Sequence, residues 1–182
     1  RYDEPRYVPR LSHFVPVFCE SSDYFYNFVR FNTNNLTNYT EMIILVLNCG
    51  SSSLKYQLLD MKSDEVYDLL AKGLVERIGM EAGCLKHQAT GKEKFEKEMP
   101  IEDHTVGIKA VIDALLDKEY GVLSSLEDIE AVGHRVVHGA EEFVCSQLIT
   151  DAVVEQLEKC SVFAPLHNPA NILGIKAVSA VL

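Results

Sequence analysis

The chain of 182 residues lacks the features that would place it in a membrane, in a secretory pathway or on nucleic acid. No apolar run approaches the roughly 18 residues of a membrane-spanning helix, and no uninterrupted apolar core of a secretory signal is present. The five cysteines form no Cys-x-x-Cys pair, so reduced thiols and a cytoplasmic location are expected. Basic residues are scarce as well, with 17 Lys and Arg against 27 Asp and Glu and a net charge of −10. A nucleic-acid or anionic-membrane partner is therefore disfavoured.

The first 41 residues lack glycine, alanine and lysine, yet they hold ten of the sixteen Phe and Tyr. They show no sustained helical or strand period. We predict that residues 1–41 are a weakly ordered extension unrelated to the rest, and that Met42, which an apolar run follows, begins a domain over residues 42–182. Two glycosylation sequons at Asn35 and Asn38 carry meaning only in a secreted protein, so chance occurrence is the preferred reading.

From residue 42 onward, hydrophobic periodicity predicts alternating elements. A last helix is expected from an Asn168 N-cap, with Pro169 in its first turn, to Leu182. The order indicates an α/β fold in which an antiparallel meander forms part of a mixed sheet covered by helices. The other expected elements are strands over 43–47, 54–61 and 65–70, a hairpin over 83–99 turning at 89–92, a helix from a cap at Asp103 to near Gly121, a strand over 129–137, and a helix from Thr150 or Asp151 to Cys160.

Three short segments concentrate the residue types that carry chemistry. The first reads NCGSSSLK, residues 48–55. A turn of one glycine and three serines leaves backbone N–H groups and hydroxyls unobstructed, and the nearby Lys55 adds a positive charge, which suits a polyphosphate. The segment is not a Walker A loop, because a strand follows it in place of a helix. A plain polar hairpin loop is the alternative.

The second segment reads GHRVVHG, residues 133–139. On a strand, alternation sends Arg135 and Val137 to one face and His134 and His138 to the other. An arginine beside a small apolar side chain suits a short carboxylic acid, although a purely structural ion pair of Arg135 is equally consistent. A metal pair of the two histidines is disfavoured, because they would lie about 13 Å apart on a strand.

The third segment reads APLHNP, residues 164–169. His167 directly precedes an expected helix N-terminus, where anions bind to free N–H groups and to the positive end of the helix dipole. The alternative is that Asn168 only caps the helix and that His167 is a solvated loop residue.

These segments, read as MIILVLNCGSSSLK, EAVGHRVVHGAE and FAPLHNPANILGI, resemble the N-terminal part of the acetate kinase family over residues 42–182. The resemblance implies the first of two domains of an actin-like ATPase, a ribonuclease H-like α/β domain in which helices flank a mixed sheet. It also implies the reaction of ATP and acetate to give ADP and acetyl phosphate, with Mg²⁺, and a homodimer when the chain is of full length.

By position, the resemblance implies that Asn48 contacts both the metal ion and the phosphates. Ser51 and Ser53 would lie along the phosphates, and Lys55 would help to bind ATP.

Arg135 would bind the acetate carboxylate and the phosphoryl group in transfer. Val137 and Leu166 would line the pocket of the methyl group, and His167 would lie at the rim of the active site. Cys49 and Ala140 depart from the family pattern, which favours alanine and glycine there.

The resemblance places the family's catalytic Asp, a second His and Arg, a metal-binding Glu and the adenine pocket beyond Leu182. The segment alone is therefore expected to be inactive. A propionate or butyrate kinase and a non-catalytic remnant are the alternatives.

Overall fold

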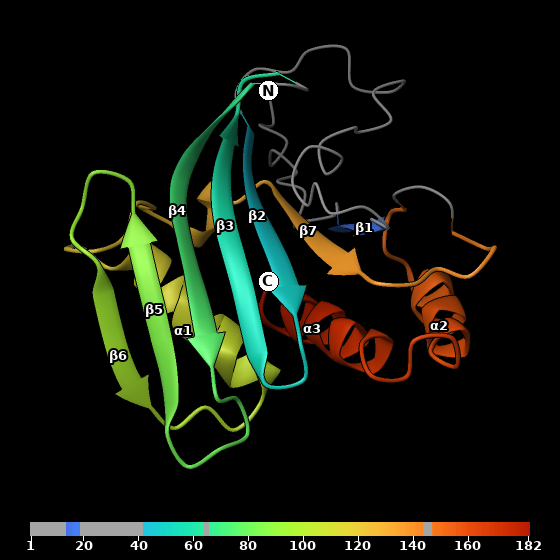
Figure 1. Cartoon of the computed structure of the whole chain (residues 1–182). Coiled ribbons are helices and arrows are strands. Elements are labelled where there is room, and N and C mark those ends of the chain that lie inside the picture. The colour runs from blue at the N-terminus through green and yellow to red at the C-terminus, as the bar shows by residue number, and fades with distance from the viewer. Residues whose placement is uncertain (1–13, 19–41, 64–65, 144–146) are drawn as a thin grey trace, which may run out of the picture.

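A computed structural model describes residues 14–18, 42–63, 66–143 and 147–182 (Figure 1). Of the extension, only Phe14–Phe18 is described, as strand β1. The other residues of the segment 1–41 lie outside the described ranges. The predictions of weak order, of a domain start at Met42 and of chance sequons therefore stay predictions. The remaining elements are β2 (Met42–Cys49), β3 (Ser53–Met61), β4 (Tyr67–Glu76), β5 (Gly83–Ala89), β6 (Phe95–Met99), α1 (His104–Leu116), a 3₁₀ turn (Leu126–Asp128), β7 (Ala131–Val136), α2 (Asp151–Cys160) and α3 (Asn168–Val181).

The strands form one mixed sheet in the order β1-β7-β2-β3-β4-β5-β6. Strands β2 to β6 are an antiparallel meander, and β7 returns to pair parallel with β2. The expected α/β class and mixed sheet are thus confirmed. β1 pairs parallel with the outer edge of β7, and Pro16 suits an edge strand because proline cannot donate to a central ladder.

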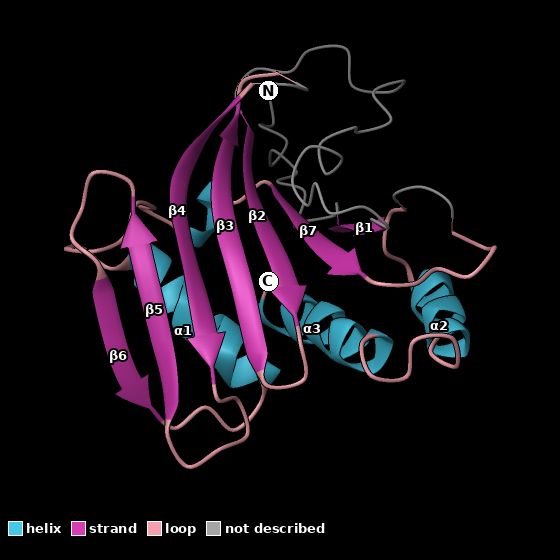
Figure 2. Ribbon diagram, in the orientation of Figure 1, coloured by secondary structure: helices cyan, strands magenta, loops and turns pink. Residues whose placement is uncertain are grey.

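The helices of the described residues cover one face of this sheet. In Figure 2, α1 and α3 lie behind the strands, and α2 lies beside α3 beyond β7. Alternate residues of β2 and β3, such as Leu45, Leu47 and Leu58, are fully buried in the core that includes α1 and α3. Their neighbours Ile44, Val46 and Leu59 form a smaller cluster on the opposite face. None of the described helices is long and apolar enough to cross a membrane.

The helix starts follow ordinary capping chemistry. The side chain of Asp103 accepts from the N–H of Val106, and Thr150 accepts from Val153, so both expected caps are confirmed. The first helix is shorter than expected: α1 ends at Leu116 and does not approach Gly121. The reason is Asp117, whose carboxylate accepts from the N–H groups of Glu119 and Tyr120 at 2.8 and 2.9 Å and starts a turn.

Two further expectations were wrong in detail. The third strand begins at Tyr67 and continues to Glu76, well past the expected end at residue 70, because its later residues pair with β3 as well as β5. The N-cap of α3 is His167, and Asn168 is the first helical residue. The Asn168 side chain does not cap the helix, because it bonds to the backbone of His138.

Candidate functional site

The candidate site lies where two parallel strands end. β2 ends at Cys49 and β7 at Val136, and their parallel pairing brings both carboxyl ends to the same edge of the sheet. Ligands of open α/β sheets characteristically bind at this edge. The serine segment follows β2 directly, and the GHRVVHG segment occupies the end of β7, so the fold brings the first two predicted motifs together.

Lys55, Asn48 and Arg135 form a row across β3, β2 and β7 on the face opposite the helices. Asn48 pairs with Lys55 in the β2–β3 register, and the last registered pair of β2 and β7, Leu47 with His134, immediately precedes Asn48 and Arg135. Neighbouring strands lie about 4.8 Å apart. One amide and two cations thus occupy adjacent strands at the edge where a phosphate would bind.

Burial confirms the expected facing of Arg135. Ala131 belongs to the cluster on the face opposite the helices, so alternation along β7 places Arg135 there as well, whereas Val137 lies one residue past the end of the strand. Val136 packs on the helix side with Leu157 and Ile175. Arg135 and Val137 are only half-buried, which leaves both side chains accessible to a small ligand.

The serine loop, residues 50–52 between β2 and β3, is held by three hydrogen bonds of its backbone. The N–H of Gly50 donates to the Ser53 carbonyl at 2.7 Å, which closes the turn. The buried His104, at the start of α1, donates from Nε2 to the Gly50 carbonyl at 2.7 Å, and the N–H of Ile78 donates to the Ser52 carbonyl. Ser51 remains exposed, so the loop presents a hydroxyl from a fixed backbone.

The third motif forms the turn between α2 and α3. His167 is exposed, and its side chain makes no capping hydrogen bond. Leu166 is 80% exposed and Phe163 63% exposed, and the Phe163 ring stacks on His138 with 5.6 Å between ring centroids. This turn therefore presents apolar side chains next to the end of β7, and the pocket shared by Val137 and Leu166 remains a prediction.

Sequence reasoning missed Asn171 and gave Asn168 the wrong role, and these two residues connect the motifs. Asn168 and Asn171 are buried on the first turns of α3. Asn171 donates from Nδ2 to the Cys49 carbonyl at 2.6 Å and accepts from the N–H of Val137 at 3.1 Å. The signal was present in the sequence, because two amides at positions i and i+3 share a helix face with the apolar Ile172 and Ile175.

Close packing under the site shifts two ionisation equilibria. Burial lowers the pKa of His134 to about 4 and raises the pKa of the Cys49 thiol to about 12. Both side chains face Gly174 of α3, where an added Cβ would overlap the Cys49 sulfur and the His134 ring. His134 donates from Nδ1 to the Arg135 carbonyl at 2.7 Å, so it is a neutral packing residue behind the Arg135 strand.

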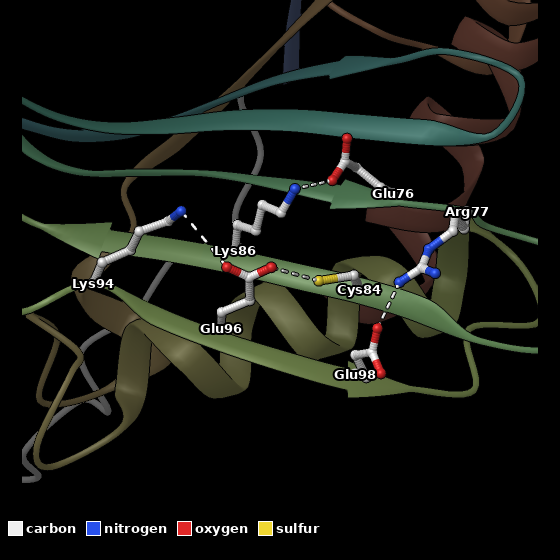
Figure 3. Close-up of polar contacts among 7 residues, drawn as sticks. All are labelled: Glu76, Arg77, Cys84, Lys86, Lys94, Glu96 and Glu98. Atoms are coloured by element: carbon white, nitrogen blue, oxygen red, sulfur yellow. Dashed lines mark hydrogen bonds and ion pairs between the residues drawn. The ribbon is translucent and has the colours of Figure 1, made fainter.

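On the face of the sheet opposite the helices, charged side chains on and next to β4, β5 and β6 form a network of ion pairs (Figure 3). Glu76, which pairs in register with Ser53, contacts Lys86 in a close ion pair, and this contact lowers the pKa of the Glu76 carboxyl. Arg77 and Glu98 form a further pair at 3.0 Å. Lys86 thus compensates the charge of the carboxylate that pairs in register with Ser53.

Within the described ranges, no three or more His, Cys, Asp or Glu side chains gather as a metal site. The uncharged side-chain oxygens at the strand ends are those of the Asn48 amide and the serine hydroxyls. Mg²⁺ usually binds proteins through few direct ligands and otherwise through waters and substrate phosphates. The residues present therefore fit a cation carried mainly by substrate phosphates, to which Asn48 would offer an amide oxygen.

Fold and site together define an α/β domain in which Lys55, Asn48 and Arg135 lie at the ends of neighbouring strands of a mixed sheet. A model described as the Acetokinase family matches residues 43–182, and the chain belongs to that family. It is 55% identical over 141 residues to the acetate kinase of Alkaliphilus metalliredigens and 52% identical to acetate kinase 2 of Clostridium perfringens. Each match covers 78% of this chain and 35% of the relative, so the chain spans about a third of the relatives' length.

Solved structures agree with this assignment. The acetate kinase of Porphyromonas gingivalis matches with a TM-score of 0.72 and 44% identity, over 76% of this chain and 34% of that one. The propionate kinase of Francisella tularensis matches with a TM-score of 0.67 and 35% identity, over 77% of this chain and 34% of that one. The actin-like ATPase fold class implied by the sequence resemblance is thereby confirmed.

Proposed function

We propose that this chain supplies the phosphate- and carboxylate-binding part of a carboxylate kinase that converts ATP and acetate into ADP and acetyl phosphate. The observation that carries the proposal is the row of Lys55, Asn48 and Arg135 at the ends of β2 and β7. Two cations and an amide in that place suit an anionic substrate, in a chain whose overall charge of −10 repels one.

The serine loop and Lys55 hold the nucleotide. Ser51 and Ser53 would lie along the phosphates, Lys55 would contribute positive charge to ATP binding, and Asn48 would hold the phosphates and Mg²⁺. The cation, when bound, would neutralise charge on the phosphates. The anchoring of the loop by His104 and Asn171 keeps these groups aligned before substrate arrives, which reduces the entropy cost of reaching the transition state.

Arg135 holds the substrate carboxylate and stabilises the phosphoryl group during transfer. A carboxylate oxygen attacks the γ-phosphorus in line, the bond from that phosphorus to the bridging oxygen breaks, and ADP leaves with the electron pair. The carboxylate is already ionised at pH 7, so no general base has to remove a proton. The protein contributes alignment and charge stabilisation.

Val137 and the apolar turn that carries Leu166 form the wall for the substrate's methyl group, and His167 lies at the rim. The exposure of Leu166 leaves room for a longer alkyl chain, and a propionate kinase is among the structural neighbours. Propionate or butyrate is therefore the second candidate substrate.

The remaining two-thirds of the relatives' length would supply further catalytic groups and the adenine pocket, so we propose that this segment alone binds ligand without turnover. We also propose that the complete enzyme is a homodimer. A non-catalytic role in phosphate binding is the remaining alternative.

The direct test is a titration of the 182-residue chain with acetyl phosphate and with MgATP, followed by backbone amide NMR. We expect shifts at residues 48–55 with both ligands and at residues 135–138 with acetyl phosphate. Titrations with acetate, propionate and butyrate then rank the carboxylates. Shifts confined to other parts of the chain, or none at millimolar ligand, would contradict the proposal.

A further inference from the structure

Two buried asparagines of α3 hold the backbone segments on which the candidate site is built. Asn168 and Asn171 are 0% and 2% exposed. Asn168 accepts from the N–H of His138 at 3.1 Å and donates to the His138 carbonyl at 2.7 Å. Asn171 accepts from the N–H of Val137 at 3.1 Å and donates to the Cys49 carbonyl at 2.6 Å. One helix face thus engages the ends of both parallel strands.

The chemistry of these contacts requires an amide. A carbonyl oxygen only accepts and a backbone N–H only donates, so each side chain must offer one donor and one acceptor at once, which fixes the orientation of both amides. Aspartate at neutral pH has no donor, and leucine has neither group. Because the contacts are buried, water is poorly placed to replace a missing partner.

Asn171 differs from Asn168 in what it joins. Both contacts of Asn168 go to His138, whereas Asn171 bridges β2 and the segment after β7. The registered pairing of these strands ends at Leu47 and His134, so this side chain spans the strands just beyond their shared ladder. Cys49 lies between Asn48 and the serine loop, and Val137 follows Arg135 by two residues.

The geometry points to Asn171 as a positioning residue that sets the separation between the serine loop and the Arg135–Val137 segment, with Asn168 fixing the direction of the chain after Val137. The inference rests on the proposed function, because this separation is the distance between the phosphate-binding and carboxylate-binding groups. In-line transfer is sensitive to displacements of about 1 Å. The serine loop is held at its other side by His104, so loss of Asn171 frees only one anchor.

The test compares three variants of the 182-residue chain: Asn171→Leu, which removes both contacts, Asn171→Asp, which removes the donor, and Ile172→Val, a control in the adjacent buried position. Urea unfolding establishes that each variant is folded. Amide hydrogen exchange followed by NMR then measures the protection of the Val137 N–H, and calorimetric or NMR titration measures the affinity for acetyl phosphate.

We expect Asn171→Leu to accelerate amide exchange at Val137 and to weaken acetyl phosphate binding about tenfold or more. The affinity of Ile172→Val for acetyl phosphate should stay within twofold of that of the parent. The new carboxyl in Asn171→Asp regains a donor when it is protonated. Its affinity, taken relative to the parent at the same pH, should therefore recover from pH 7.5 to pH 5, and that of Asn171→Leu should not. A residue that serves only to stabilise the fold predicts no such recovery.

Affinity of Asn171→Leu equal to that of Ile172→Val would overturn the positioning role, as would a loss in Asn171→Asp that is independent of pH. If the parent chain binds neither acetyl phosphate nor MgATP, the proposed function itself has failed. Exchange at Val137 then decides the remaining structural claim, and unchanged protection in Asn171→Leu would contradict the bridge.

Discussion

Asn171 and Cys49 lie 122 residues apart in the chain and are joined by a buried 2.6 Å hydrogen bond from the Asn171 amide to the Cys49 carbonyl. The bond ties the helix that follows the third motif to the strand that precedes the first. The three motifs are therefore one structural unit, and perturbations of this unit should be separable from perturbations of the rest of the sheet.

Arg135→Ala should weaken acetyl phosphate binding about tenfold or more, because the substrate loses a charged, bidentate donor. The affinity of Arg135→Lys for acetyl phosphate should lie between those of Arg135→Ala and the parent chain, since lysine keeps the charge and lacks the planar guanidinium group. Calorimetric titration of the 182-residue chain measures both. Arg77→Ala, which removes an exposed arginine paired with Glu98, is the matched control and should bind like the parent. Equal affinities of the two alanine variants would remove Arg135 from the site.

Gly174→Ala should lower the free energy of unfolding by about 1–3 kcal/mol, because its Cβ overlaps the Cys49 sulfur and the His134 ring. Gly107→Ala is the natural comparison, since this helical glycine of α1 has its nearest neighbours at 3.6 Å. That variant should gain up to about 1 kcal/mol from helix propensity. Urea unfolding of both chains measures the contrast, and a stabilising Gly174→Ala would refute the close approach of α3 to β2 and β7.

The stability of the fold should decrease as the pH falls from 6.5 to 4. Burial lowers the pKa of His134 from 6.5 to about 4, so over this interval the unfolded chain binds a proton that the folded chain excludes. Unfolding free energy therefore falls with pH by up to about 1.4 kcal/mol per unit for this group. The pKa of the buried His87 is lowered in the same direction.

His134→Asn keeps a donor for the Arg135 carbonyl and removes the titrating ring. Its unfolding free energy should depend less steeply on pH over the same interval, with the remaining slope due in part to His87. Urea unfolding at half-unit steps from pH 4 to pH 7 gives both slopes. Identical slopes for parent and variant would show that His134 does not exclude the proton.

Lys86→Met should weaken the binding of MgATP by about twofold at low salt, because the Glu76 carboxylate next to Ser53 loses its partner. Lys94→Met removes the same charge from a residue that pairs with Glu96 further along the sheet, and should have less effect. Titrations at low and high salt distinguish the two. A deficit in Lys86→Met that persists at high salt would indicate a cause other than charge.

The sequence predicted most of what depends on local pattern. Apolar runs and caps such as Asp103 and Thr150 place strands and helices, and alternation along β7 places Arg135 on the face opposite the helices. Asn168 was misread because its local role as a cap competes with a partner 30 residues away, and only the folded chain shows which partner prevails. Asn171 was missed for the same reason, since its importance lies in two backbone groups that sequence proximity does not bring together.

The most direct test of the central claim is to exchange residues 42–182 into the acetate kinase of Alkaliphilus metalliredigens, in place of the 141 residues they match, and to measure ATP-dependent formation of acetyl phosphate from acetate. We expect an active enzyme that loses about 100-fold or more of its turnover with Arg135→Ala and keeps it with Arg77→Ala. A folded exchange enzyme without activity, or one that Arg135→Ala leaves fully active, would refute the proposed function.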